Sequence, residues 1–400
     1  MPALADFRGS PNSLAPHYAR FRVAERRLLT GHSHQAWPDV GFEGQVEAWT
    51  DAADLVDEKW DRAEAKAARV RRGFGALLAT ADNEIVLGQN THELVVRFLS
   101  ALPLRERPRL VTTDGEFHTI RRQLDRLVEE RVVEIVKVST EPPAAIAERL
   151  VAAVDDRTAA VLVSSVLYAN ARIVTSLDRV MERCRAMGAE LLVDAYHQIG
   201  VVPCALRRDG LDDAFVTGGG YKYCQLGEGN CFLRVPPGRA MRPVITGWYA
   251  EFAALGDSPG SGVTYGAGPA RWAGATYDPT SHYRAARVFD FFDAQGLTPP
   301  LLRDVSQHQV GLLARRFDEL DLDPAVITRD RTVPIEAFGG FLALRTRQAG
   351  RLQAALRRRG VLTDHRGEVL RFGPAPYLAD QQLEAAVAAL AEALGEVRQG

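Results

Sequence analysis

The chain has 400 residues, which is enough for a large core and, by the usual size relation, for two domains. Its 46% hydrophobic and 25% charged residues are ordinary for a globular protein and argue against disorder. The 49 Lys and Arg residues nearly balance the 51 Asp and Glu residues, for a formal net charge of -2. This balance gives no support to a nucleic-acid or membrane-surface partner.

Lysine is scarce in this chain. Of the 49 cationic residues, 45 are arginines and four are lysines: Lys59, Lys66, Lys137 and Lys222. A lysine amine can lose its proton and form an imine, whereas a guanidinium effectively cannot. Each lysine is therefore a candidate for chemistry that arginine does not perform.

The cysteines and the first residues bear on the compartment. Cys184, Cys204, Cys224 and Cys231 are too few and too scattered for a disulfide framework, and they form no CxxC pair. The segment MPALADFRGSPNS lacks the apolar core of a signal peptide, and no apolar run approaches the ~18 residues of a membrane span. We therefore expect a cytoplasmic protein.

The elements expected up to residue 281 alternate between strands and helices. Residues 45–79 predict one long amphipathic helix rich in Ala, Glu and Arg. Strands are then expected at 84–87, 109–112, 133–138, 159–165, 190–193, 214–217 and 231–235, and helices near 93–101, 119–130, 143–153 and 176–187. This alternation is typical of βαβ units. It predicts an α/β fold with a mainly parallel seven-stranded sheet and helices on both faces.

The pattern changes near residue 282. Helices are expected at 282–294, 303–319, 348–358 and 381–397, with short strands near 338–345 and 368–372. We therefore expect residues 46–281 to form the large domain and residues 282–400 a smaller α+β domain. The segment 1–45 is expected to pack with the small domain.

In a parallel sheet, ligands bind beyond the carboxyl ends of the strands, so polar residues directly after a strand are candidates. Asn90 and Thr91 can cap a helix that starts near His92, and such a helix N-terminus can bind phosphate, although Thr91 could be a simple N-cap. Asp194 follows another strand and needs a partner if it is buried. That partner could be a cationic ring nitrogen of a ligand, with His197 supporting the carboxylate from behind. The alternative is a capping Asp beside a core histidine.

The third candidate lies in the segment GGGYKYCQLGEG, residues 218–229. Its glycines permit close backbone approach to a ligand, and Lys222 could form a Schiff base if it is desolvated. The other lysines lie on an exposed-looking helix or at a strand end. A phosphate site, an acid for a pyridinium nitrogen and a Schiff-base lysine, in this order, describe a site for pyridoxal 5'-phosphate (PLP).

Three stretches carry a resemblance to a known family: DAYHQIG (194–200), GGGYKYCQLGEG (218–229) and TDHRGEVLRFGPAPYLAD (363–380). They resemble motifs of the fold-type I PLP enzymes of the class V aminotransferase superfamily, and most closely those of kynureninases. The resemblance covers roughly residues 30–380.

The resemblance implies roles for the residues of these motifs. Lys222 is implied to form the imine with PLP, and Asp194 to pair with the pyridinium nitrogen, with His197 behind it. Tyr221 is implied to contact the phosphate and is a candidate proton donor. Arg371 is implied to hold the α-carboxylate of an amino-acid substrate.

Further cofactor contacts follow from the same resemblance. Thr91 matches the residue that binds the phosphate at the first helix, with His92 beside it. Phe117 falls where the family stacks an aromatic ring on the cofactor, and His118 competes for this role because cysteine desulfurases stack a histidine. Trp248 falls at the family's Gly-Trp phosphate contact.

Two stretches depart from the kynureninase pattern. In RWAGATYDP, Thr276 stands at the position of an Asn. Class V relatives use a Thr there to bind the phosphate of the neighbouring subunit, which implies a homodimer. In GHSHQ, histidines at 32 and 34 replace the usual residues of a substrate-facing loop, so we expect Ser33 and His34 to contact the substrate. His32 and His34 could also be a metal pair, but no clear third or fourth ligand is present, and we expect no metal.

The resemblance implies a PLP-dependent hydrolase that cleaves the Cβ–Cγ bond of kynurenine or a related γ-oxo amino acid, giving alanine and an aromatic acid, as in tryptophan catabolism. A β-lyase or aminotransferase of class V is the alternative. Cysteine desulfurase is disfavoured because it needs a nucleophilic Cys in the C-terminal domain, and the last cysteine is Cys231. A non-catalytic paralogue is the alternative from another class. The presence of Lys222, Asp194 and Arg371 argues against it, because a protein without activity would be free to lose them.

Overall fold

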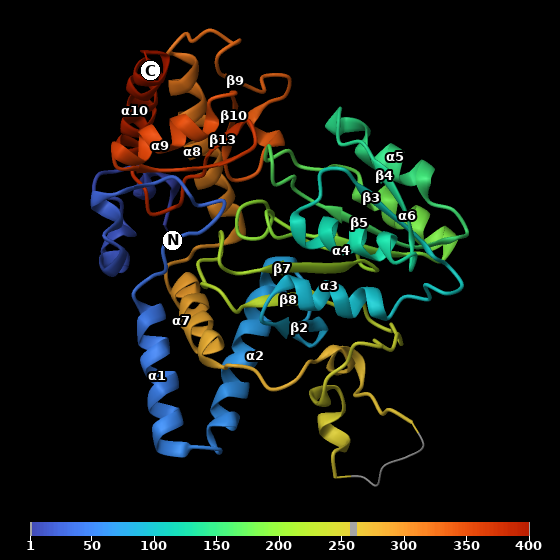
Figure 1. Cartoon of the computed structure of the whole chain (residues 1–400). Helices are drawn as coiled ribbons and strands as arrows, with labels where there is room; N and C mark the ends of the chain where they lie inside the picture. The colour runs from blue at the N-terminus through green and yellow to red at the C-terminus, as the bar shows by residue number, and fades with distance from the viewer. Residues whose placement is uncertain (1, 257–261, 400) are drawn as a thin grey trace.

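The structure is a computed structural model that describes residues 2–256 and 262–399, and seven of its strands form one sheet (Figure 1). The order is β2-β8-β7-β6-β5-β3-β4, with β8 antiparallel to both neighbours and the other pairs parallel. These strands are β2 (Ile85–Gly88), β3 (Arg109–Thr113), β4 (Glu134–Val138), β5 (Thr158–Ser164), β6 (Glu190–Asp194), β7 (Phe215–Gly219) and β8 (Cys231–Arg234). The predicted mainly parallel seven-stranded sheet is therefore confirmed.

Alternate residues of the strands face two separate cores. In β5, Val161 and Val163 belong to a core shared with α2, α5, α6 and α7, whereas Ala160 and Leu162 belong to a core shared with α3 and α4. These helices are α2 (Lys59–Leu78), α3 (Thr91–Ser100), α4 (His118–Glu129), α5 (Ile146–Ala153), α6 (Leu177–Met187) and α7 (Thr280–Ala294). Because side chains alternate along a strand, a strand buried on both faces is apolar throughout, which is why β5 was recognisable in the sequence.

The helix predicted over residues 45–79 is two helices, α1 (Val40–Leu55) and α2, and this prediction was wrong. The chain turns at Val56, which has a φ of 54°. The turn lets both helices pack against α7 (Figure 1). The approach is close: a Cβ on Gly44 would lie 2.7 Å from the carbonyl oxygen of Tyr283, and one on Gly73 would lie 2.4 Å from the ring of Phe289. The break at Val56 thus allows both helices to pack against α7, which is far away in the sequence.

The C-terminal region contains a four-stranded antiparallel sheet in the order β12-β13-β10-β9. Its strands are β9 (Thr328–Arg329), β10 (Leu342–Arg345), β12 (Asp364–Arg366) and β13 (Val369–Phe372), and its helices are α8 (Pro299–Asp318), α9 (Ala349–Arg358) and α10 (Asp380–Gln399). Helix α8 starts earlier than expected because Thr298 caps it, and a proline in the first turn loses no helical hydrogen bond. A smaller C-terminal α/β region is thus confirmed.

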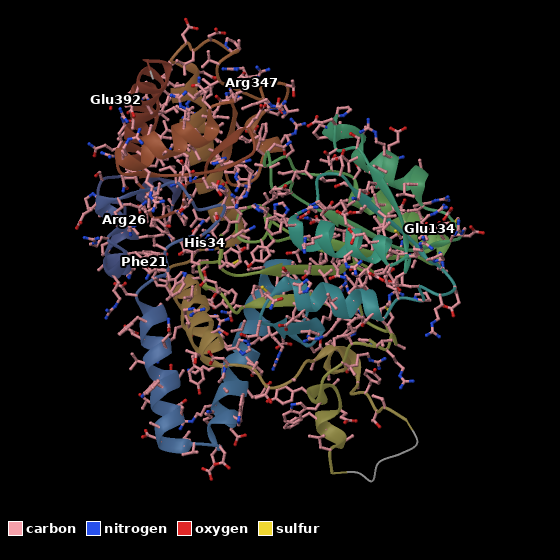
Figure 2. All side chains as sticks on the ribbon, viewed as in Figure 1. Phe21, Arg26, His34, Glu134, Arg347 and Glu392 are labelled. Carbon is pink, nitrogen blue, oxygen red and sulfur yellow. The ribbon has the colours of Figure 1, made fainter. Side chains whose placement is uncertain are left out.

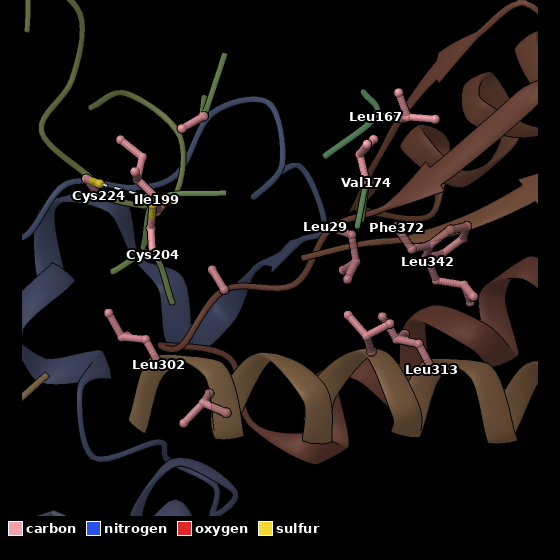
Figure 3. Packing of buried hydrophobic residues seen from close by; sticks show 14 of the residues in the cluster. Leu29, Leu167, Val174, Ile199, Cys204, Cys224, Leu302, Leu313, Leu342 and Phe372 are labelled. Carbon is pink, nitrogen blue, oxygen red and sulfur yellow. Dashed lines mark hydrogen bonds between the residues drawn. The ribbon is translucent and has the colours of Figure 1, made fainter. Parts of the chain in front are cut away.

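The N-terminal segment packs into this C-terminal region. Strand β1 (Arg27–Leu28) pairs in parallel with β11 (Val361–Leu362), and Thr30 forms a bridge with Gly373. Figure 3 shows Leu29 beside Phe372 and Leu342, which belong to the same core cluster. The domain boundary near residue 281 stays a prediction.

Short 3₁₀ helices connect the larger elements at Leu4–Phe7, Ala15–Phe21, Val23–Glu25, Asp82–Glu84, Pro143–Ala145, Trp248–Ala254, Gly268–Trp272 and Ile335–Ala337. Within the described part of the chain, no helix is both long and apolar enough to cross a membrane.

Candidate active site

A cavity of about 300 Å³ lies where β5 and β6 end and where the loop after β7 begins. Ser164 ends β5, Asp194 ends β6, and the loop after β7 carries Lys222. The cavity is lined by Gln89, Asn90, Thr91, His92, Phe117, Thr119, Ser164, Val166, Tyr168, Asp194, Tyr196, His197, Tyr221, Lys222, Glu228, Gly229 and Cys231. A space of this size suits a small ligand. The cavity lies at the strand ends where parallel sheets bind ligands.

Lys222 is buried in the cavity wall, with 4% of its surface exposed. Its Nζ lies 2.7 Å from Nε2 of His197 and 4.6 Å from the centre of the Tyr196 ring. Burial lowers the pKa of Lys222 to about 7, and the nearby Asp194 carboxylate opposes this shift. A large share of the amine is therefore neutral, and so nucleophilic, near neutral pH.

The other lysines lie in different surroundings. Lys66 forms a half-buried ion pair with Glu47 at 2.6 Å, and Lys137 forms one with Asp125 at the surface. Lys59 begins α2. Lys222 is therefore the lysine that the structure brings into the cavity.

The Asp194 carboxylate is buried beside the Lys222 amine. Its Oδ1 accepts a hydrogen bond from the Tyr196 backbone N–H at 2.9 Å. Burial raises its pKa, whereas the Tyr196 N–H and Lys222 oppose the shift. A buried carboxylate with one such hydrogen bond has room for a cationic partner. The protonated ring nitrogen of a pyridine would supply that partner.

The partner of His197 is the Lys222 amine, and the expected support of Asp194 by His197 stays a prediction. Its Nε2 contacts Lys222, and its buried Nδ1 has no hydrogen-bond partner among the described residues. Burial lowers the pKa of His197 well below its ordinary value, so the ring is neutral. The Lys222 amine can donate to Nε2, in which case the ring proton sits on Nδ1. His197 therefore orients the lysine.

The N-terminus of α3 forms one end of the cavity. Asn90 is its N-cap, and the side-chain oxygen accepts from the Glu93 N–H at 2.9 Å, so Thr91 is not needed as a cap. Thr91 is the first helical residue and lines the cavity together with His92. A hydroxyl at a helix N-terminus suits a phosphate group.

The structure separates the two candidates for ring stacking. Phe117 lines the cavity and packs edge-on against Tyr168, with ring centres 5.3 Å apart. His118 begins α4, and its Nδ1 lies 3.2 Å from Nη2 of Arg121. Phe117 is therefore the residue positioned to contact a bound ring.

Arg371 is buried but is not among the residues that line the cavity. Its guanidinium donates to both carboxylate oxygens of Asp364, at 2.8 Å from Nε and 2.5 Å from Nη2. Its Nη1 donates to the backbone carbonyl of Tyr168 at 2.7 Å. The sequence had implied an arginine free to bind substrate, whereas this one already has an internal carboxylate partner.

His34 lies at the edge of the cavity through its contact with Tyr221. The two rings stack with centres 4.8 Å apart and an interplanar angle of 22°. Ser33 Oγ lies 3.0 Å from Nδ1 of His34. His34 is labelled in Figure 2, and the N–H of the next residue, Gln35, donates to the carbonyl of Tyr221 in the loop after β7. Tyr221 itself lines the cavity, but Ser33 and His34 do not.

Trp248 and Thr276 lie outside this cavity. Both are exposed, and Nε1 of Trp248 donates to Oγ1 of Thr276 at 3.3 Å. The sequence had placed both at the cofactor phosphate, Thr276 in the neighbouring subunit. Within one chain they form a polar pair at the surface.

Glu116 is a buried acid that the sequence reasoning missed. Its carboxylate accepts from the hydroxyls of Ser164 at 2.6 Å and Thr113 at 2.7 Å. Burial raises the pKa of Glu116 to about 7, which the hydrogen bonds from Ser164 and Thr113 oppose and the charge of Asp194 favours. An acid that follows a strand by three residues looks like any loop carboxylate in a sequence, so the pattern contained no usable signal.

Nothing in the described parts of the chain gathers three His, Cys, Asp or Glu side chains around a common metal position. His32 and His34 have different partners, Asp364 and Ser33 respectively. The cysteines are also unsuited to nucleophilic roles, because burial raises the pKa of Cys184, Cys204, Cys224 and Cys231 to about 12.

The sequence is similar to kynureninases, although no family model matches it. Kynureninases of Xanthomonas oryzae pv. oryzae (strain PXO99A) and Xanthomonas euvesicatoria pv. vesicatoria (strain 85-10) are each 27% identical to it over 199 residues. This match covers 46% of the chain and 46% of each relative. The chain therefore matches about half the length of these relatives.

Several solved structures share the whole fold. A mutant of C-DES with glycine covalently linked to its PLP cofactor matches with a TM-score of 0.82, covering 94% of this chain and 98% of that one. A cysteine desulfurase from Thermococcus onnurineus NA1 (TM-score 0.80) and one from Escherichia coli (0.79) each cover 97% of this chain and 99% of theirs. All three are 15% identical in sequence.

The chain thus has the fold of the fold-type I PLP-dependent enzymes, as its motifs implied. Within that class, its sequence is similar to kynureninases, which agrees with the kynureninase-like motifs around Asp194, Lys222 and Arg371. The groups at the cavity fit PLP: a buried amine, a carboxylate with room for a cation, and a helix N-terminus with a hydroxyl.

Proposed function

We propose that this protein is a PLP-dependent enzyme that acts on an amino acid. The observation that carries the proposal is Lys222, a buried amine with a lowered pKa in a cavity that also holds a buried carboxylate. When bound, PLP supplies an electron sink for charge that develops at the carbon atoms of the substrate.

The residues of the chain would share the remaining work. The Asp194 carboxylate would keep the proton on the ring nitrogen, and Phe117 would pack against the ring face. Thr91 and the N-terminus of α3 would hold the phosphate. The Lys222 amine, oriented by His197, would move the proton at Cα, and Tyr221 would donate a proton to the leaving group.

Hydrolytic Cβ–Cγ cleavage of kynurenine or a related γ-oxo amino acid is the reaction we propose. The sequence similarity to kynureninases and the kynureninase-like motifs support it. The protein would then act in tryptophan catabolism, in a cytoplasm where its four unpaired cysteines stay reduced.

A β-lyase or aminotransferase reaction fits the site comparably. The cystine C-S lyase C-DES shares the fold, which favours C–S cleavage as the second candidate. The cysteine desulfurase reaction with a nucleophilic thiol is disfavoured, because all four cysteines are buried and their raised pKa values keep the thiols protonated.

Product analysis distinguishes these reactions. The PLP-loaded protein is incubated with kynurenine or 3-hydroxykynurenine, and anthranilates and alanine are measured. Alanine with an anthranilate supports hydrolysis, whereas pyruvate supports elimination and a need for an amino acceptor supports transamination. Lys222→Ala should abolish turnover, and Lys137→Ala, which alters a surface ion pair, serves as the control. Full activity of Lys222→Ala would refute the proposal.

We also propose that the protein is a homodimer in which Thr276 completes the neighbouring site. Support comes from the apolar side chains exposed on α1 (Phe42, Val46 and Trp49) and from the placement of Thr276 outside the cavity of its own chain. Exposed apolar stripes of this kind are typical of interfaces. The mass in solution, measured by light scattering, tests the dimer.

A further inference from the structure

The loop residue His32 is fully buried, and its ring lies directly against the backbone of Gly373. A Cβ on Gly373 would lie 2.1 Å from Nδ1 of His32, and one on Gly31 would lie 2.4 Å from the carbonyl oxygen of Pro374. Only glycine leaves this much room, so the ring is held in one place. None of the roles proposed above uses His32.

Asp364 connects His32 to Arg371. Its Oδ1 lies 2.7 Å from Nε2 of His32 and also accepts from Nε of Arg371 at 2.8 Å. Burial lowers the pKa of His32 to about 4, so the ring is neutral at pH 7, and a carboxylate can only accept hydrogen bonds. Nε2 of His32 therefore carries the ring proton and donates it to Asp364.

Arg371 is fixed on three sides. The Asp364 carboxylate accepts hydrogen bonds from Nε and Nη2 of Arg371, and the Tyr168 carbonyl accepts one from Nη1. The Phe341 ring lies 5.5 Å from Cζ of Arg371 and 4.7 Å from the centre of the His32 ring. Among the described residues, one hydrogen on Nη1 and one on Nη2 are left without a partner. Tyr168, which fixes Nη1, itself lines the cavity.

We propose that His32 and Asp364 are positioning residues, which turn the Arg371 guanidinium so that its remaining Nη1 and Nη2 hydrogens bind the α-carboxylate of the substrate. The inference rests on the proposed function, because it presumes an amino-acid substrate. A carboxylate binds a guanidinium best when both oxygens meet one edge, so the orientation of that edge decides the affinity. His32 acts on the substrate through Asp364 and Arg371.

The test compares two ligands that differ only in the carboxylate. Alanine and ethylamine are titrated into the PLP-loaded protein, and binding is read from the visible spectrum of the cofactor. His32→Phe keeps an aromatic ring but removes the hydrogen-bond donor. We expect it to lower the affinity for alanine about tenfold, as for a lost hydrogen bond to a charged group, and to leave the affinity for ethylamine unchanged. His32→Gln, which can place an amide N–H near the position of Nε2, should retain most of the alanine affinity.

Each outcome decides the question. Equal weakening of alanine and ethylamine by His32→Phe would show a general structural role and overturn the inference, as would an unchanged alanine affinity. If His32→Phe does not fold, His32→Ala adds no volume and should give the same selective loss. An unaltered protein without a cofactor spectrum would refute the proposed function itself, which is a separate result.

Discussion

The protonation of Lys222 can be measured directly and tests the physical basis of the site. Burial lowers its pKa from the ordinary 10.5 to about 7. At pH 7 about half of the Lys222 amines should then be neutral, against about one in 3000 for a lysine with the ordinary value. The site should therefore contain a reactive amine at a pH at which surface lysines are almost fully protonated.

The scarcity of lysine makes the measurement simple. The cofactor-free protein is methylated with formaldehyde and a borane reductant at pH values from 6 to 11, and each of the four lysines is followed by peptide mass spectrometry. The reagent attacks neutral amines and is small enough to enter the cavity. We expect half-maximal reaction of Lys222 near pH 7. Lys137, at the surface, is the internal control.

Two substitutions should move this midpoint in opposite directions. Asp194→Asn removes a charge that stabilises the ammonium and should lower the midpoint, whereas Arg371→Met removes a repulsive charge and should raise it. A Lys222 midpoint near 10 in the unaltered protein would refute the reasoning. Unchanged midpoints in both variants would show that burial alone, and not these charges, sets the pKa of Lys222.

Three further predictions concern groups outside the reaction itself. Burial raises the pKa of Glu116 from 4.5 to about 7, so the folded protein loses stability as the pH rises toward and through 7. Between pH 5 and pH 8, the free energy of unfolding of Glu116→Gln, measured with urea, should fall by roughly 3 kcal/mol less than that of the unaltered protein. Burial lowers the pKa of His282 from 6.5 to about 4, and its ring has no hydrogen-bond partner among the described residues. The folded protein should therefore lose stability as the pH falls from 6.5 to 4, and His282→Phe should remove roughly 3 kcal/mol of that loss. Trp49 is 80% exposed on α1, and Trp49→Glu should convert the proposed dimer to monomer in light scattering.

Each of these predictions has its own control. Parallel pH profiles of Glu116→Gln or His282→Phe and the unaltered protein would contradict the corresponding burial argument. For the dimer, Glu43→Gln on the same helix is the matched control, and an unchanged mass for Trp49→Glu would place the interface elsewhere.

The strands and the reactive lysine were predictable because their signals are local. The strands β5 and β6 are apolar on both faces, and each is followed within a few residues by the polar groups of the cavity. Lys222 stood out because a lysine between glycine-rich turns follows an apolar strand. Such features depend on neighbours within about ten residues, and a sequence shows these directly.

The partners of the predicted residues were not predictable, because they come from distant parts of the chain. The sequence could not show that Arg371 donates to the carbonyl of Tyr168, 203 positions away, or that its near neighbour Asp364 pairs with His32, 332 positions away. The position of His197 likewise depends on the packing of two strand ends. The break at Val56 places two helices against α7, which lies more than 200 residues later. Each of these arrangements involves tertiary contacts that the local pattern does not contain.

The pairing of His32 with Asp364 has a consequence for synthesis of the protein. These residues are 332 positions apart, and the Ala36 N–H donates to the phenol oxygen of Tyr377 across 341 positions. The loop around His32 is synthesised well before Asp364 and Tyr377, so its contacts with them have to wait for the later residues. Contacts between such distant residues form slowly. A nascent chain that stops before residue 361 could build the seven-stranded sheet and the lysine loop. It would lack Asp364 and Tyr377, which hold the loop around His32 in place.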